Sequence, residues 1–135
     1  MKSLLPIAIV LALATAYGLW YQRSRGKVVV KSDKGLITQE MIGAALGSRV
    51  TLVQFSSAFC SPCRATRMLL EDVTAEMSEV AYVEIDAEAN LELVRTLDIR
   101  STPTTLFLDR TGHEVGRAMG APKRDQVLSA ISAIH

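Results

Sequence analysis

The sequence predicts an α/β fold in which a mixed central sheet is flanked by helices. Two observations lead to this prediction. Short apolar, β-branched runs, which are typical of buried strands, alternate with segments of helical periodicity. Their order is strand, helix, strand, helix, hairpin and helix, which fits a mixed sheet covered on both faces. The 135 residues are enough for one domain of ordinary size and a short appendage.

Four strands are predicted from the apolar runs and the turn signals around them. The first run is apolar almost throughout, which indicates a strand buried on both faces. A turn at residues 109–112 ends in glycine and joins the last two strands as a hairpin. Before the first of the four strands, a polar, basic linker contains Val28, Val29 and Val30, which form a candidate edge strand. The four predicted strands are residues 50–55, 81–86, 104–108 and 114–119.

Helices are predicted before, between and after these strands. Thr38 is expected to cap a first helix that ends at Gly47. Pro122 is expected to open the last helix, where its missing N–H costs nothing. The apolar residues expected to face the core are Met41, Ile42, Ala45 and Leu46 in the first helix, Met68, Leu69, Val73 and Met77 in the second, Leu91, Val94 and Leu97 in the third, and Val127, Leu128, Ile131 and Ile134 in the last.

The N-terminal segment is predicted to be a membrane anchor. Residues 4–21 contain no charged residue, and this is about the shortest length that spans a bilayer as a helix. Trp20 and Tyr21 close the run and a basic flank follows, as at a membrane interface. A cleaved signal peptide is the alternative, because residues 14–16 form an A-x-A-like site. A buried helix of the domain is the least favoured interpretation, since no face of the segment is polar.

Charge and cysteine content limit the class of function. The formal net charge of +1 gives no sign of a basic stripe that could neutralise phosphates, so no nucleic-acid partner is expected. Two cysteines are too few for a disulfide-rich scaffold, so the fold has to depend on its apolar core. We expect an anchor at residues 1–22, a linker at 23–35 and one domain at 36–135.

Both cysteines lie in one short motif, C-S-P-C. Cys60 follows a predicted strand and Pro62 suits the first turn of a helix, so Cys60 is expected at the helix N-cap. There, free N–H groups and the helix dipole favour a thiolate. Cys63, about one turn later, can reach its sulfur, and Arg64 and Arg67 add positive charge nearby. An open thiolate beside a sheltered thiol is what two-step thiol–disulfide exchange requires.

Two other uses of the cysteines are weaker. A zinc site needs four ligands, and the two histidines, His113 and His135, lie far along the chain. Neither a metal nor a cofactor is therefore expected. A structural disulfide between residues so close in sequence closes a very short loop and would stabilise little. The pattern favours a redox pair over half a metal site or an inert disulfide.

Three segments resemble the thioredoxin family, and together they cover about residues 36–134. "LVQFSSAFCSPCR" is similar to the family's strand and C-x-P-C motif, "VAYVEIDAE" to its central strand, and "DIRSTPTTLFLDRTGHEVGRAMGAP" to its proline loop, hairpin and glycine turn. The resemblance implies a thioredoxin-like fold, and a cis bond between Thr102 and Pro103 that faces the cysteines. The Thr102 backbone would then pair with an extended substrate segment. From the residues alone, a trans proline at the start of an edge strand is the expectation.

Four positions depart from the family pattern. Phe59 stands where a tryptophan usually precedes the first cysteine, which keeps an apolar wall and loses an N–H donor. Gln54 replaces a buried aspartate and Tyr82 the lysine that accompanies it. Gln54 cannot titrate, so the family's proton acceptor for the resolving thiol is missing, unless Gln54 is only a hydrogen-bonded core residue. Thr102 replaces the isoleucine common in cytosolic thioredoxins, and these changes favour a specialised, tethered relative.

The sequence therefore predicts a membrane-tethered enzyme that exchanges disulfides with protein substrates and with a redox-partner protein. Cys60 is expected to attack and Cys63 to resolve. Phe59, Thr102 and Pro103 are expected to bind substrate, and Pro62, Arg64 and Gln54 to support the pair. A peptide-binding module with incidental cysteines and a Cu(I) metallochaperone are the alternatives. We expect a single-pass protein of the cell membrane with its redox domain outside the cytoplasm.

Overall fold

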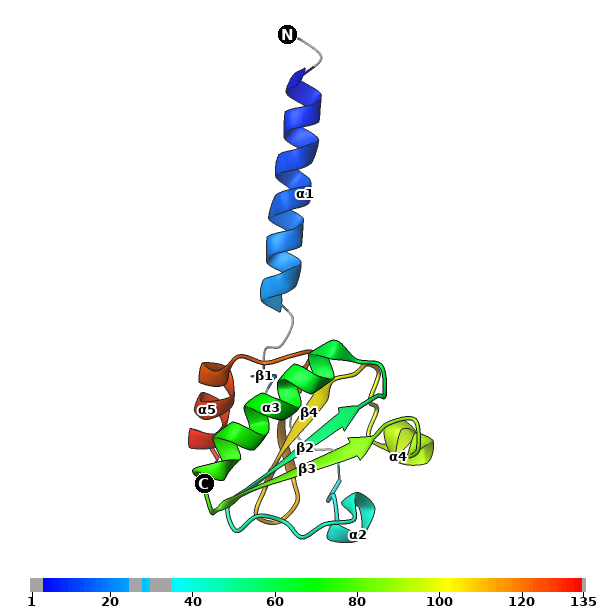
Figure 1. The fold of residues 1–135 in the computed structure, drawn as a ribbon, viewed down its shortest axis with the longest axis vertical. Helices are drawn as coiled ribbons and strands as arrows, with labels where there is room; N and C mark the ends of the chain where they lie inside the picture. Colours follow the sequence, from blue (N-terminus) through cyan, green and yellow to red (C-terminus); the bar gives the residue numbers. More distant parts are fainter. Residues whose placement is uncertain (1–3, 25–27, 30–34, 135) are drawn as a thin grey trace.

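A five-stranded mixed sheet forms the centre of the domain, which confirms the predicted α/β class (Figure 1). The structure is a computed structural model that describes residues 4–24, 28–29 and 35–134. Its strands are β1 (Val28–Val29), β2 (Val50–Ser56), β3 (Val80–Asp86), β4 (Thr104–Asp109) and β5 (Glu114–Met119). Their order across the sheet is β1-β5-β4-β2-β3. β2 and β3 are parallel, and the other neighbouring pairs are antiparallel.

Helices cover both faces of this sheet, and Figure 1 shows α3 lying across one of them. The helices are α1 (Leu4–Ser24), α2 (Gln39–Ile42), α3 (Ser61–Ala75), α4 (Leu91–Thr96) and α5 (Arg124–Ser132). One apolar cluster joins α3 and α5 to the sheet through residues such as Leu70 and Ile131. A second cluster joins α2 and α4 to it through residues such as Ile42 and Val94. The core therefore has two layers, one on each side of the strands.

Strand β2 belongs to both layers, because all seven of its residues are buried. Leu52 packs in the cluster of α3 and α5, and Val53 in the cluster of α2 and α4. Successive side chains of a strand point to opposite faces, so Gln54 faces the same side as Leu52. That side is covered by α3, the helix that contains Cys63.

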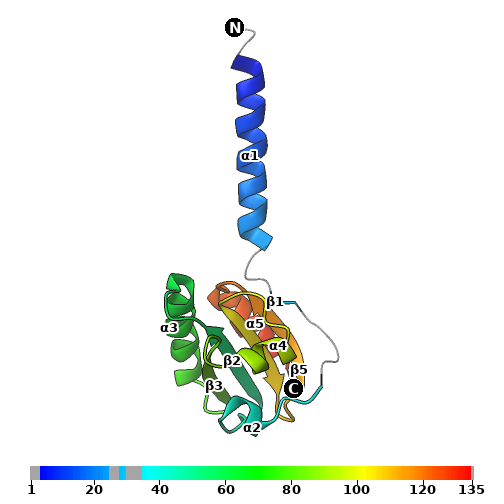
Figure 2. The same ribbon diagram turned by 90° about the vertical axis from the view of Figure 1, so that its right-hand side faces the viewer.

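Helix α1 extends away from the domain (Figure 2). Its stretch Leu4–Arg23 is long and apolar enough to cross a membrane, and none of it is buried. This exposure contradicts the alternative of a helix buried in the domain. A signal sequence passes the same test of length and composition, so the anchor and the signal peptide both stay open.

Two helix boundaries differ from the predictions. The helix capped by Thr38, α2, stops at Gly43 rather than at Gly47. Gly43 adopts a left-handed conformation with φ of 69°, which turns the chain out of the helix. The last helix begins at Arg124 rather than at Pro122. Pro122 is buried one residue before the cap, Lys123, and so precedes the helix instead of opening it.

Three residues predicted to face the core do not: Met68, Leu91 and Ala45, of which Ala45 lies beyond the end of α2 and is exposed. Met68 is 66% exposed on the outer face of α3, because Thr66 and Leu70 occupy the inward positions around it. Leu91, the first residue of α4, is also exposed. Of the candidate edge strand, Val28–Val29 forms β1, and Val30 lies outside the described residues.

Candidate redox site

The cysteine pair lies where β2 ends and α3 begins. β2 ends at Ser56, and α3 starts at Ser61 with Cys60 as its N-cap. The Cys63 N–H donates a hydrogen bond to Cys60 Sγ at 3.1 Å, as it would to any capping side chain. Pro62 fits the first turn, where a backbone N–H would have no helical partner. The local sequence thus places a sulfur at the positive end of the helix dipole.

The two sulfurs form a disulfide but differ in exposure. The distance between Cys60 Sγ and Cys63 Sγ is 2.11 Å. Cys63 is only 1% exposed, whereas Cys60 is half-buried. Phe59, directly before Cys60, is fully exposed. A substrate that approaches this end of the domain therefore meets Phe59 and Cys60 and does not meet Cys63.

The proline loop lies at the same end of the sheet. β4 begins at Thr104, which is opposite Phe55 near the end of β2. Ser57 Oγ, just after β2, lies 3.1 Å from Thr102 Oγ1, a contact that the sequence did not predict. The bond between Thr102 and Pro103 is cis, as the resemblance implies, and Pro103 is buried. The structure thus brings the expected substrate-binding segment close to the chain that leads to the cysteines.

Gln54 lies beneath the start of α3 and has no exposed surface. Its Nε2 donates to the backbone carbonyl of Cys63 at 2.9 Å, and its Oε1 accepts from the Tyr82 hydroxyl at 2.5 Å. Both ends of the buried amide are therefore hydrogen-bonded. A neutral amide does not accept a proton near neutral pH, so this residue can hold the α3 start in place but cannot act as a base.

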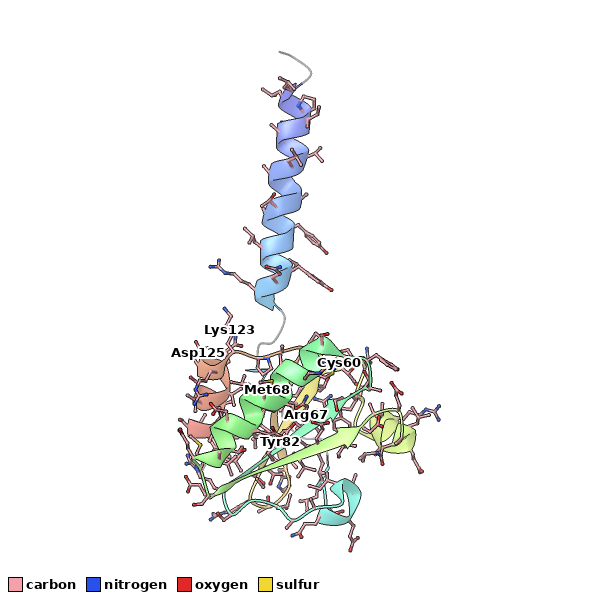
Figure 3. All side chains as sticks on the ribbon, viewed as in Figure 1. Cys60, Arg67, Met68, Tyr82, Lys123 and Asp125 are labelled. Atoms are coloured by element: carbon pink, nitrogen blue, oxygen red, sulfur yellow. A yellow bond between two sulfur atoms is a disulfide. The ribbon has the colours of Figure 1, made fainter. Side chains whose placement is uncertain are left out.

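The hydrogen bonds continue from Gln54 to Tyr82 and then to Arg67 at the protein surface; Figure 3 labels Tyr82 and Arg67. The Tyr82 hydroxyl also lies 3.1 Å from the Glu84 carboxylate, to which Arg67 Nη2 donates at 2.6 Å. Hydrogen bonding from Arg67 holds the pKa of the Glu84 carboxyl below its ordinary value. Burial, and then the charge of Glu84, raises the pKa of Tyr82. At neutral pH this network therefore contains an ion pair, a neutral phenol and an amide, and none of them changes charge there.

The structure separates the two arginines that the sequence grouped beside the cysteines. Arg67 is paired with Glu84 on β3, so a carboxylate offsets its charge, whereas Arg64 is exposed on the first turn of α3. Glu84 was not among the predicted site residues. Its place in the site can be recognised only once β2 is paired with β3. Gln54 then lies opposite Glu84, and Tyr82 is two residues from Glu84 on the same face of the sheet.

These features define a dithiol–disulfide redox domain. One sulfur is accessible, its partner is sheltered, and a proline loop lies beside them. In residues 4–24, 28–29 and 35–134, no three His, Cys, Asp or Glu side chains are grouped so that they could hold a metal ion.

Comparison with known proteins gives the family. The sequence profile named Thioredoxin matches residues 37–133. A thioredoxin of Chlamydia pneumoniae is 30% identical over 97 residues, covering 72% of this chain and 94% of that protein. Thioredoxin H2-1 of Oryza sativa subsp. japonica is 29% identical over 88 residues, covering 65% of this chain and 62% of that protein. The X-ray structure of Fasciola hepatica thioredoxin superposes with a TM-score of 0.57 at 28% identity, covering 64% of this chain and 81% of that one. The chain therefore belongs to the thioredoxin family, and it is a redox protein with a cysteine pair able to form a disulfide.

Proposed function

We propose that this protein is a membrane-tethered thiol–disulfide oxidoreductase that acts on protein disulfides. The observation that carries the proposal is the unequal exposure of two bonded sulfurs at the N-terminus of α3. A partner can reach Cys60, whereas Cys63 is accessible mainly to its neighbour. This difference suits an exchange in two steps through a mixed disulfide.

In the reducing direction, the Cys60 thiolate attacks one sulfur of the substrate disulfide. A mixed disulfide forms, and the other substrate sulfur leaves as a thiolate that takes a proton from water. Cys63 then loses its proton and attacks Cys60 Sγ, which releases the first substrate sulfur and forms the Cys60–Cys63 disulfide. The substrate has gained two electrons and two protons. The dithiol of a redox-partner protein then reduces the Cys60–Cys63 disulfide by the same steps in reverse, which restores two electrons and two protons to this protein. Substrate oxidation runs this cycle backwards.

Neighbouring residues are proposed to hold the substrate and to tune the thiolate. The exposed ring of Phe59 offers an apolar surface, and the backbone of Thr102 beside Pro103 offers a short edge for an extended segment. Pro62 and the exposed cation of Arg64 favour the Cys60 thiolate at the helix start.

Gln54 is proposed to slow the second step. Its hydrogen bonds fix the Cys63 backbone, but they provide no group that can take the Cys63 proton. That proton then passes to water or to the substrate, and mixed disulfides last longer than in a relative with a carboxylate at this position.

The tether is proposed from α1. We assign residues 1–22 to a single membrane anchor, 23–35 to a linker and 36–135 to the redox domain, which we place outside the cytoplasm, where disulfide-forming substrates occur. Protease added to intact spheroplasts should then remove the domain. Complete protection would place it on the cytoplasmic side.

The activity is tested with two matched variants. Cys63→Ser should accumulate mixed disulfides with a protein substrate such as insulin, because the sulfur that resolves them is absent. Cys60→Ser should accumulate none and should lose turnover, because the remaining sulfur is buried. Non-reducing gels and insulin reduction assays measure both results. If Cys60→Ser traps partners and Cys63→Ser does not, the roles are reversed; turnover by the double serine variant would exclude the redox function.

A further inference from the structure

The chain enters the domain at the same end of the sheet as the redox site. β1 is antiparallel to β5, and β5 is antiparallel to β4, so β1 runs in the direction of β4. β4 begins at Thr104, directly after Pro103 of the site. The first residue of β1, Val28, is therefore the one nearer the cysteines.

The strand register places Val28 level with residues of the site. Val28 is opposite Ala118, Ala118 is opposite Thr105, and Thr105 is opposite Gln54. Three strand spacings separate the ends of this row, roughly 14 Å in all. Gln54 donates a hydrogen bond to the backbone carbonyl of Cys63, so the row ends at the residue that contributes the buried sulfur of the pair.

The connection from α1 to this row is short. α1 ends at Ser24 and β1 begins at Val28, and four Cα–Cα steps reach at most about 14 Å. The candidate membrane span ends at Arg23. If α1 crosses a bilayer, β1 must therefore begin within about 15 Å of the point where the helix leaves it. Cys60 lies at the end of the domain nearest α1, as Figure 3 shows.

We propose that the redox site faces the membrane, and that its partner is an integral membrane protein that presents a disulfide or a cysteine pair at the membrane surface. This inference rests on the membrane tether of the proposed function. A site held close to the bilayer meets groups on the bilayer surface at a high effective concentration, whereas a large soluble protein has little room between the domain and the lipid. The exposed side chains of Phe59 and Met119 at this end give such a partner apolar contacts.

The test uses a lipid-borne disulfide as the probe: phosphatidylethanolamine with a pyridyl disulfide on its headgroup. Two full-length, single-cysteine variants are reconstituted into vesicles. Cys63→Ser leaves Cys60 at the site end. Cys60→Ser/Cys63→Ser/Arg110→Cys places a thiol in the exposed β4–β5 turn, at the opposite end of β4. Each rate of pyridine-thione release is divided by the rate with a soluble pyridyl disulfide, which removes the intrinsic reactivity of each thiol.

The lipid-to-soluble ratio should be about tenfold higher for Cys60 than for the Arg110→Cys thiol. A flexible insert of about twenty Gly and Ser residues after Gly26 adds roughly 25 Å of reach and should bring the two ratios together. Equal ratios with the native linker, or a difference that survives the insert, would overturn the inference.

Flotation of the vesicles separates this failure from failure of the tether. Protein that floats and gives equal ratios overturns only the orientation. Protein that does not float with the lipid overturns the tether and the orientation together, and the insulin assay still reports on the cysteine pair. In cells, mixed disulfides trapped by Cys63→Ser should be with proteins that resist extraction by alkaline carbonate, and predominantly extractable partners would contradict the proposed partner class.

Discussion

Gln54 is the residue at which this chain differs most from what its cysteines would suggest. It is buried, its amide is hydrogen-bonded at both ends, and it holds the backbone carbonyl of Cys63, the residue whose thiol must lose a proton. Gln54→Glu has nearly the same shape. A protonated carboxyl can still donate to the Cys63 carbonyl and accept from Tyr82, so this variant adds a titratable group with little change in packing.

Gln54→Glu should make stability depend on pH. Burial raises the pKa of the new carboxyl in the folded state above its unfolded value, so the folded state binds the proton more tightly. Relative to the unsubstituted protein, the free energy of unfolding of the variant is then highest below about pH 4, and it falls as the pH rises toward the folded pKa. We expect a loss of roughly 2–4 kcal/mol, relative to the unsubstituted protein, between pH 5 and pH 8. Urea denaturation at the two pH values measures it.

The same variant should resolve mixed disulfides faster near neutral pH, since an ionised carboxylate can take the Cys63 proton. Stopped-flow reduction of a model disulfide measures the rate. Gln54→Met is the control, because it removes both hydrogen bonds and adds no titratable group. A folded Gln54→Glu variant with the pH dependence and rate of Gln54→Met would show that Gln54 acts only through packing.

Tyr82→Phe tests the hydrogen bond at the other end of the amide. The variant leaves Gln54 Oε1 buried without its hydroxyl donor, and we expect a loss of about 1–3 kcal/mol in the free energy of unfolding. In a Gln54→Met background the same substitution should cost clearly less, because the acceptor is gone. Equal costs in the two backgrounds would mean that the hydrogen bond contributes nothing measurable.

Sequence reasoning identified the central residues of the site but not their surroundings. Cys60 and Cys63 could be placed from local signals alone, a strand followed by a proline in a helix start. Gln54 was recognised as a buried polar residue, whereas its link through Tyr82 to Glu84 depends on the pairing of β2 with β3. That pairing joins segments far apart in the chain, and no local pattern specifies it.

At the scale of elements, a buried ion pair fixes α4 to the sheet. Arg117 and Glu114 on β5 are 7% and 2% exposed and form hydrogen bonds through two nitrogens, one of them at 2.8 Å. Arg117 also donates to the carbonyls of Leu97 and Asp98, at 3.0 and 3.1 Å, just after α4. Charged residues in a strand usually indicate a solvent face, so no sequence pattern predicted this contact.

Arg117→Met should cost about 3–5 kcal/mol, because it leaves the Glu114 carboxylate buried without a partner. Replacing Glu114 by Met as well should recover part of that loss. The matched control is Arg100→Met, which breaks an exposed pair with Asp98 and should change stability by less than about 1 kcal/mol. Similar losses for the Arg117 and Arg100 variants would show that burial of the ion pair is unimportant.

At the scale of the whole molecule, the domain and α1 should be separable. The apolar stretch of α1 is unburied, so it contributes little packing to the domain. A chain lacking residues 1–24 should stay in aqueous solution and melt within about 3 °C of the full chain in detergent. Thermal melts followed by circular dichroism check this. A truncated chain that melts much lower would reveal stabilising contacts between α1 and the domain.

The α/β class and the order of strands and helices follow from patterns that depend only on neighbouring residues, and they were predictable for that reason. The place where the linker joins the sheet was not. Val28 and Val29 suggested an edge strand, but two residues cannot specify which edge they pair with or in which direction.

The attachment through β1 also has a mechanical consequence. Any load between the anchor and the domain first reaches a strand of two residues, paired only with β5 at the edge of the sheet. Pulling it off leaves β2–β5 intact, and the next described attachments are the bridge from Leu36 to His113 and the hydrogen bond from the Ile37 N–H to the Gly112 carbonyl. The free chain between Ser24 and Leu36 then reaches roughly 40 Å instead of about 14 Å. A stretched tether would therefore lengthen stepwise while the strands that position the disulfide stay paired.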